Sequence, residues 1–199
     1  MLKFVRAAIC VVMLAGLSAG PASAQDWPVQ RWQCAPFARL ASGIQIFGDA
    51  RTWWDQADGR YERGNAPEVG AVLAFKATGR MRFGHVAMVS EIVDSRTIKV
   101  THANWSPING SRGQVEENVE VVDVSEANDW SEVRVWYAPL SGLGTGAHPT
   151  YGFIYADDAA LQHAAAIRTG APAPLIRTIA PLDDAIGELI AATDHVVGE

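Results

Sequence analysis

The sequence predicts an α+β domain in which N-terminal helices pack on an antiparallel β-sheet, followed by a helical C-terminal tail. Apolar residues recur at helical spacing near the start of the chain. Runs rich in β-branched residues follow as far as about residue 140, and short connections separate them. Helices first and strands afterwards are typical of α+β proteins. With 199 residues, 49% hydrophobic, and a mean hydropathy of +0.04, the chain can bury a substantial core.

Residues 1–24 have the features of a secretory signal. Lys3 and Arg6 precede an apolar run at residues 7–17, and Ala22-Ser23-Ala24 is a small-residue cleavage site. The run is too short to span a membrane, and no second run of about 18 apolar residues follows. We therefore expect a periplasmic or secreted protein without a membrane segment after cleavage; the alternative is an uncleaved anchor.

Charge excludes one class of partner. The net charge is −6, and it becomes −8 once Lys3 and Arg6 leave with the signal. Nucleic-acid binding needs clustered Lys and Arg residues, so a chain this acidic argues against that function.

Two helices are expected at the start of the mature chain. In the first, at residues 34–41, Pro36 suits the first turn and Gly43 provides a stop. Asp49 is placed to cap a second, shorter helix that ends near residue 57.

The strands are expected where β-branched residues alternate between turn residues. Residues 76–82 and 94–96 have the composition of hairpin connections, which favours antiparallel pairing. The predicted strands cover residues 71–75, 85–93, 97–104, 115–124 and 133–137.

These elements give three predicted regions: a signal at residues 1–24, a catalytic domain at 25–140, and a C-terminal extension at 141–199, partly helical or flexible. The extension contains a helical stretch at 156–168, a linker at 170–174 and an amphipathic segment at 181–197. That last segment either packs on the body or offers a surface to a protein partner. We expect three histidines in the extension to be solvated: His148, His163 and His195.

The mature chain has a single thiol. Of the two cysteines, Cys10 leaves with the signal, so Cys34 has no intramolecular partner in an oxidising compartment. It is buried, joined to another molecule, or catalytic. Its place at the start of a predicted helix favours catalysis, because the free amide groups there lower the pKa of a thiol and can bind an oxyanion.

Two histidines are expected to meet in the sheet. His85 opens one predicted strand and His102 lies near the end of the next, with Asn104 on the same face as His102. Pairing through the turn at 94–96 brings the two histidines close together. A helix Cys, a strand His and a polar orienting residue form the layout of papain-like thiol hydrolases. The alternatives are a zinc site made by Cys34, His85 and His102, or histidines that are simply hydrogen-bonded strand residues.

The chain resembles the CHAP family, the cysteine- and histidine-dependent amidohydrolases and peptidases, over about residues 30–140. The Gln-Cys and Gly-His-Val blocks, in this order and at this separation, are a specific combination. The resemblance rests on Trp32-Gln33-Cys34-Ala35-Pro36-Phe37-Ala38-Arg39, Gly48-Asp49-Ala50 with Trp53-Trp54, Pro67, Gly70-Ala71-Val72, Phe75, Gly84-His85-Val86-Ala87-Met88-Val89-Ser90, and His102-Ala103-Asn104-Trp105.

The resemblance implies a papain-like fold and hydrolysis of an amide bond in peptidoglycan, with stem peptides as substrate and no metal or other cofactor. Cys34 matches the nucleophile and His85 the general base. Asn104 matches a family Asn, and His102 stands where the family often has Glu, which leaves two candidates for orienting His85. Gln33 is a candidate for binding the oxyanion, and Trp105 is expected to reach the cleft.

The sequence is also compatible with two other functions: a non-catalytic wall-binding or scaffold domain, and a thiol amidase that acts on a small amide. If His102 orients His85, we expect it to accept a hydrogen bond and to titrate near the ordinary pKa of histidine. His102→Glu would then extend activity to lower pH.

Overall fold

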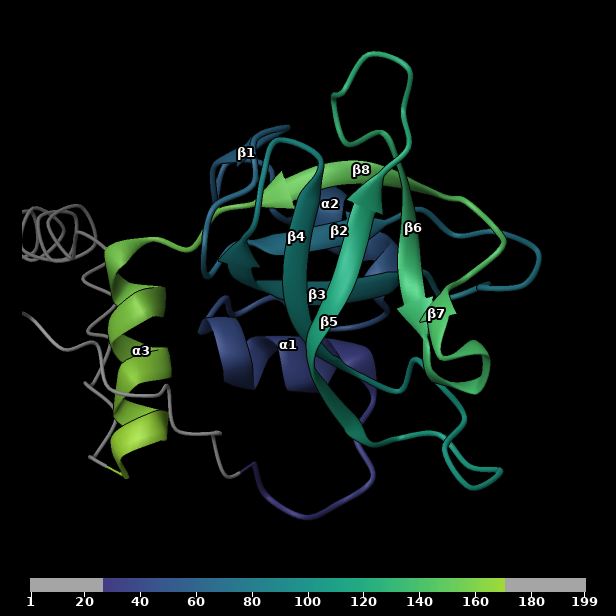
Figure 1. The fold of residues 1–199 in the computed structure, drawn as a ribbon. Coiled ribbons are helices and arrows are strands. Elements are labelled where there is room, and N and C mark those ends of the chain that lie inside the picture. The colour runs from purple at the N-terminus through teal and green to yellow at the C-terminus, as the bar shows by residue number, and fades with distance from the viewer. Residues whose placement is uncertain (1–26, 171–199) are drawn as a thin grey trace, which may run out of the picture.

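The computed structural model describes residues 27–170, and these form one sheet with helices against it (Figure 1). The expected signal and the amphipathic segment at 181–197 lie outside the described residues. No helix in the described part is long and apolar enough to cross a membrane. The helices are α1 (Cys34–Ser42), α2 (Trp53–Gln56) and α3 (Asp158–Thr169), with short 3-10 helices η1 (Ala50–Thr52) and η2 (Ala138–Leu140).

Every strand pair in the described sheet is antiparallel, which confirms the predicted α+β class and antiparallel pairing. The strands are β1 (Arg63–Gly64), β2 (Val72–Phe75), β3 (His85–Ile92), β4 (Thr97–Ala103), β5 (Val115–Asp123), β6 (Glu132–Tyr137), β7 (Gly142–Leu143) and β8 (His148–Ile154).

The sheet closes into a barrel, which differs from the sheet we expected. β8 pairs with β2 through Val72↔Ile154 and with β6 through Val133↔His148. The ring therefore runs β8-β2-β3-β4-β5-β6 and back to β8, with β1 and β7 as short additions. Closure removes both free edges from the main sheet.

The last strand of the barrel lies in the region that we had assigned to the C-terminal extension. The body of the protein continues past residue 140, because β8 lies between β2 and β6. Pro149 and Gly152 interrupt the usual strand pattern. Gly152 has φ +127, and a Cβ there would lie 2.5 Å from the carbonyl oxygen of Gly64. Only glycine allows β8 and β1 to approach so closely.

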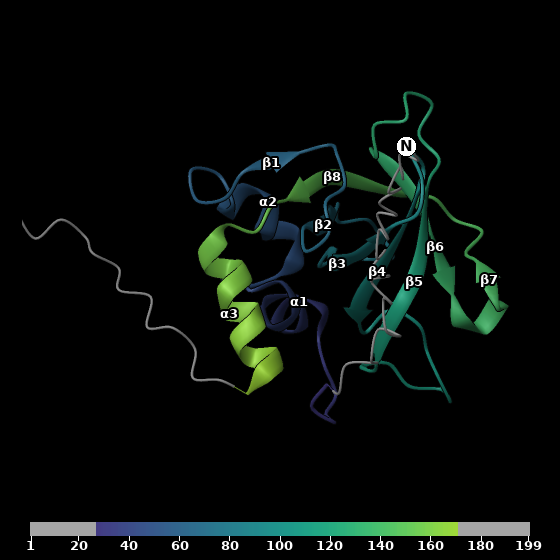
Figure 2. The same cartoon turned by 60° about the vertical axis from the view of Figure 1, so that its left-hand side comes forward.

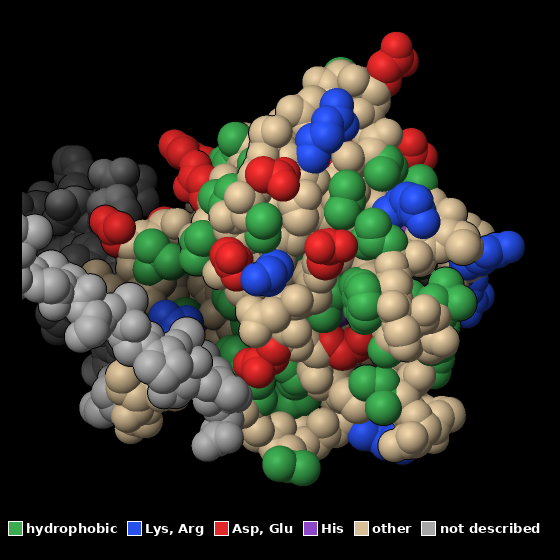
Figure 3. Space-filling model, in the orientation of Figure 1, with side chains coloured by type: hydrophobic (Ala, Val, Ile, Leu, Met, Phe, Trp, Pro, Cys, Tyr) green, Lys and Arg blue, Asp and Glu red, His purple; other side chains and the backbone are tan. Residues whose placement is uncertain are grey.

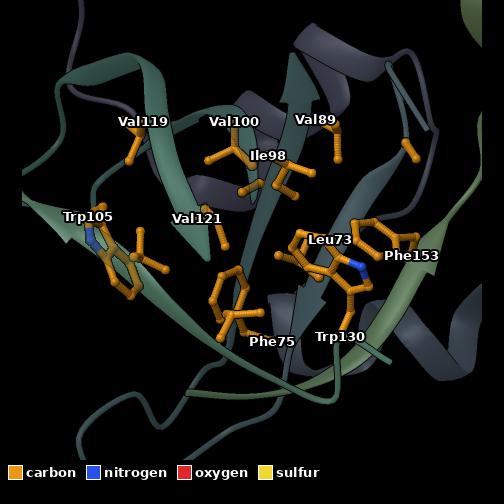
Figure 4. Packing of buried hydrophobic residues seen from close by; sticks show 14 residues of the cluster. Leu73, Phe75, Val89, Ile98, Val100, Trp105, Val119, Val121, Trp130 and Phe153 are labelled. Atoms are coloured by element: carbon orange, nitrogen blue, oxygen red, sulfur yellow. The ribbon is translucent and has the colours of Figure 1, made fainter. Parts of the chain in front are cut away.

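Two apolar layers follow from the alternation of side chains along the strands. One fills the barrel and includes Leu73, Phe75, Val121 and Phe153 (Figure 4). The other lies between the outer face of the barrel and the helices, with the α1 residues Ala35 and Ala38, Trp53 of α2 and the β-strand residues Val72, Ala74 and Val86 among its members.

Helix α1 packs against β3, β4 and α3 (Figure 2). Phe37 and Ala41 of α1 meet Ala103 of β4 in a third, smaller cluster. The apolar face of α1 therefore fixes the helix on the barrel, and its N-terminus comes to the end of the barrel where β3 begins.

Candidate active site

Cys34 is the first residue of α1 and is half-buried. Gln33 is the N-cap with an extended backbone, and Gly43 ends the helix in the left-handed region, as predicted. The backbone N–H groups of Val86 and Ala35 lie close enough to the Cys34 sulfur to lower the pKa of the thiol. Because Val86 follows His85 in β3, this contact places the thiol beside the strand that carries the histidine.

Burial raises the pKa of the Cys34 thiol, and this effect outweighs the lowering by the backbone N–H groups of Val86 and Ala35. The sequence led us to expect the reverse, because a helix N-terminus favours a thiolate. The difference has a physical reason: loss of water costs the charged form more than the backbone donors return. Cys34 is therefore a neutral thiol at rest.

His85 begins β3 and its side chain is almost fully buried. The preceding Gly84 has φ +68, and a Cβ there would lie 2.8 Å from the backbone nitrogen of Arg51. Glycine thus lets the start of β3 lie directly against the Arg51 backbone. The His85 Nε2 atom lies 3.0 Å from Nδ1 of His102, so these two rings share a hydrogen bond.

His102 lies near the end of β4, and its ring is 1% exposed. The β3–β4 register pairs Met88 with Thr101, so His102 continues opposite Ala87 and lies diagonally from His85, two residues along β3. Burial lowers the pKa of His102 to about 3. Our expectation of a titration near the ordinary value is therefore wrong, and His102 stays neutral at moderate pH. Its Nε2 atom has no hydrogen-bond partner among the described residues.

Burial also lowers the pKa of His85 well below its usual value. Smaller electrostatic contributions come from His102, His148 and Arg112. The resting pair is consequently a thiol and a neutral imidazole rather than an ion pair.

The other three candidates from the sequence surround this pair. Trp105 is buried against both rings, with centroids 4.9 Å from His85 and 5.7 Å from His102, and its Nε1 donates to the carbonyl of Trp136. Asn104 Nδ2 donates to Gln33 Oε1 at 2.9 Å. Asn104 therefore engages the residue before the nucleophile, whereas His102 engages His85.

A cleft of about 780 Å³ joins these residues at one end of the barrel. Cys34, His85, Gln33, Asn104 and Trp105 all line it. So does His148, which we had expected to be solvated in a tail. His148 is half-buried, with its ring 5.1 Å from that of Trp105, and burial lowers its pKa. The signal available in the sequence is the aromatic and β-branched content of residues 150–154, but Pro149 and Gly152 interrupt it, so it does not identify β8 by itself.

The buried histidines make stability depend on pH. The unfolded chain protonates them near pH 6.5, whereas burial keeps His85 and His102 neutral in the fold. Stability is thus complete above pH 6.5 and is lost as the pH falls toward the folded-state pKa values. Between pH 6.5 and 5 we expect a loss of about 2 kcal/mol from His102, whose pKa is about 3, and a further loss from His85. Urea unfolding at the two pH values measures it.

His102→Gln is the matched control for this effect, because it keeps a neutral polar side chain and removes one of the two buried histidines. The variant should lose about 2 kcal/mol less than the wild type over the same pH interval. An equal loss in both proteins would show that His102 is not held neutral by the fold.

Within residues 27–170, no group of three or more His, Cys, Asp or Glu side chains is placed to hold a metal ion.

Comparison with known proteins identifies one domain family. A search of curated proteins found no match to the chain. The family model named CHAP domain matches residues 24–104, a span that contains Cys34, His85, His102 and Asn104. This match associates the chain with hydrolases of the peptidoglycan amidase and peptidase type. Residues 24–104 are therefore identified as a CHAP domain.

Proposed function

We propose that the protein is a secreted cysteine hydrolase that cleaves an amide bond in the stem peptides of bacterial peptidoglycan. The observation that carries this proposal is that Cys34 and His85 line the same cleft, and that His85 is hydrogen-bonded to the buried His102 behind it. A thiol, a base and a group that orients the base are the parts that nucleophilic attack on an amide requires.

The neutral protonation states define the first step. His102 accepts the Nε2–H of His85, which leaves Nδ1 of His85 as a free base. As the Cys34 sulfur bonds to the substrate carbonyl carbon, the thiol proton passes to Nδ1 of His85. The imidazolium that forms keeps its Nε2–H bond to His102, whose low pKa ensures that it remains an acceptor.

The tetrahedral intermediate then collapses. The carbon–nitrogen bond breaks, and the leaving amine takes the proton from His85. Water attacks the thioester while His85 accepts one of its protons, and the thiol is restored as the new carboxyl group leaves. This chemistry consumes one water for each amide and needs no cofactor.

Negative charge on the substrate oxygen requires donors in the same cleft. The backbone N–H of Cys34 is one of the unpaired amide groups at the start of α1. Gln33 is the second donor that we propose: Asn104 occupies its Oε1 atom, so the amide N–H₂ group is left for the oxyanion. Asn104 is then a positioning residue for Gln33, and Trp105 is a wall of the substrate site.

We expect Gln33→Ala to lower kcat by about 10- to 100-fold, because it removes an oxyanion donor. Asn104→Gly should give a similar loss of about tenfold. Glycine is the suitable replacement because Asn104 has φ +66, a conformation that alanine would strain. The double variant should be no slower than Gln33→Ala alone, since both changes remove one function.

Steady-state kinetics on the three variants measures this coupling, with KM reported separately from kcat. If the losses in kcat of the two single variants multiply in the double variant, Asn104 does not act by positioning Gln33.

Digestion of purified peptidoglycan, followed by mass spectrometry of the fragments, tests the proposed function as a whole. New amine and carboxyl termini identify the cleaved amide, whether between sugar and peptide or within the peptide. Release of reducing sugar ends without new peptide termini would contradict an amide hydrolase. For the proposed secretion, a mature protein in the extracellular or periplasmic fraction that begins at Gln25 is the expected result.

A further inference from the structure

The charged side chains that line the cleft are all of one sign, positive. Its walls come from the start of α1, the β2–β3 and β4–β5 connections, and the segment from β6 to β8. None of the described residues that line it is Asp or Glu. The basic side chains in the lining are Arg80, Arg82 and Arg112, with His148 beside them.

This bias runs against the composition of the chain. There are 22 acidic and 16 basic residues in the sequence, and acidic and basic side chains intermingle over β4 and β5 (Figure 3). A concave site lined by charges of one sign concentrates ligands of the opposite sign.

The arginines of the cleft are not neutralised by the protein. Within residues 27–170, no carboxylate lies in an ion pair with Arg80, Arg82 or Arg112, although four other basic residues are paired. Arg80 and Arg82 lie exposed on the β2–β3 connection. Their guanidinium groups are therefore available to a ligand.

Arg112 is the arginine most closely tied to the reaction centre. Its Nη1 donates to the carbonyl of Trp105, whose ring lies against His85 and His102. Its positive charge also contributes to the lowered pKa of His85. The remaining N–H groups form the planar fork that binds a carboxylate through two parallel hydrogen bonds.

We propose that the cleft selects substrates carrying free carboxylates next to the scissile amide, with Arg112 as the main specificity residue and Arg80 and Arg82 as a second anion-binding element. The inference rests on the proposed function and deepens it. Stem peptides suit the cleft because their D-glutamate and diaminopimelate residues carry carboxylates close to the peptide and cross-link amides. A substrate in which these groups are primary amides would leave the guanidinium groups unpaired.

The test uses a matched pair of ligands. A cross-linked disaccharide–peptide dimer, isolated from peptidoglycan, contains each candidate amide with its carboxylates free; coupling with ammonia converts those carboxylates to primary amides. We expect wild-type kcat/KM to be at least tenfold higher for the free form. Arg112→Gln should reduce that preference to about threefold or less, mainly through KM. Arg60→Gln removes one exposed charge outside the cleft and should keep the wild-type preference.

A binding measurement tests this inference independently of the proposed hydrolysis. Calorimetry with Cys34→Ala protein measures the Kd of each dimer without turnover, and the free form should bind at least tenfold more tightly at 50 mM salt. At 500 mM salt that preference should shrink, because surface charge is screened. Equal Kd values, or a preference that Arg112→Gln leaves unchanged, overturn the inference. If wild type binds with the expected preference and cleaves neither dimer, the proposed function fails and the inference stands.

Discussion

Replacing Cys34 with alanine should lower the rate of peptidoglycan hydrolysis by about 10⁴-fold or more, because the proposed reaction has no second nucleophile. Cys34→Ser should be nearly as slow. Its hydroxyl is far less acidic than a thiol, and His85, whose pKa burial has lowered, is too weak a base to compensate. Turbidity loss of a peptidoglycan suspension measures both rates.

Two controls accompany the Cys34 variants: one shows that the variants are folded, and the other tests whether a metal ion takes part in hydrolysis. Cys34 packs at the margin of an apolar cluster, so alanine should leave the urea midpoint close to that of the wild type. A chelator should leave the wild-type rate unchanged, since the thiol supplies the nucleophile. Hydrolysis by Cys34→Ala at the wild-type rate would contradict the mechanism. A slow wild type that binds peptidoglycan would instead favour a wall-binding domain.

His102→Ala should lower kcat by roughly 10- to 1,000-fold, the second-largest effect that we expect. Without His102, nothing holds Nε2–H of His85, so the ring is free to turn away from the thiol. KM should change little. His102→Gln offers a neutral carbonyl acceptor in the same place and should recover most of the rate, which distinguishes orientation from a general loss of packing.

The pH profile of His102→Glu gives a sharper readout of the same role. The acid limb of kcat/KM should follow protonation of His85, because the pKa of His102 is about 3. A carboxylate beside Nε2 stabilises the imidazolium and raises the pKa of His85. The variant should therefore remain active, with its acid limb moved up by about one pH unit or more.

Two outcomes bear on this assignment. His102→Gln adds no charge, so its acid limb should stay at the wild-type position. If His102→Glu instead extends activity to lower pH, His102 itself sets the wild-type acid limb, as the sequence had led us to expect.

The five strands from β2 to β6 could be predicted from the sequence, because each is a β-branched run bounded by turn residues. The same pattern predicts that His85 and His102 meet, since a short turn at 94–96 fixes which residues of β3 and β4 lie opposite each other. Gly84, which precedes His85 in the sequence, lets the backbone of Arg51 approach the start of β3 closely. Local patterns suffice where neighbouring strands are joined by short connections.

Four features could not be predicted because they depend on contacts distant in sequence. β8 carries Pro149 and Gly152, and it becomes a strand by pairing with β2 and β6. His148 reaches the cleft only as a result of that pairing. The pKa shifts of Cys34 and His102 depend on burial, which no motif records. Similarly, Asn104 shares strand periodicity with His102, but its left-handed backbone directs it to Gln33.

The closing position of β8 has a consequence for how the protein can be divided. The family match ends at residue 104, and a boundary near 140 looks natural in the sequence, yet a fragment that stops at either point lacks the strand that joins β2 to β6. A fragment ending at 140 would present unpaired backbone N–H and C=O groups along both strands, which invites association between molecules. Loss of β8 would also open the barrel next to the cleft that contains Cys34 and His85. The smallest portion expected to remain folded and active therefore extends at least through Ile154.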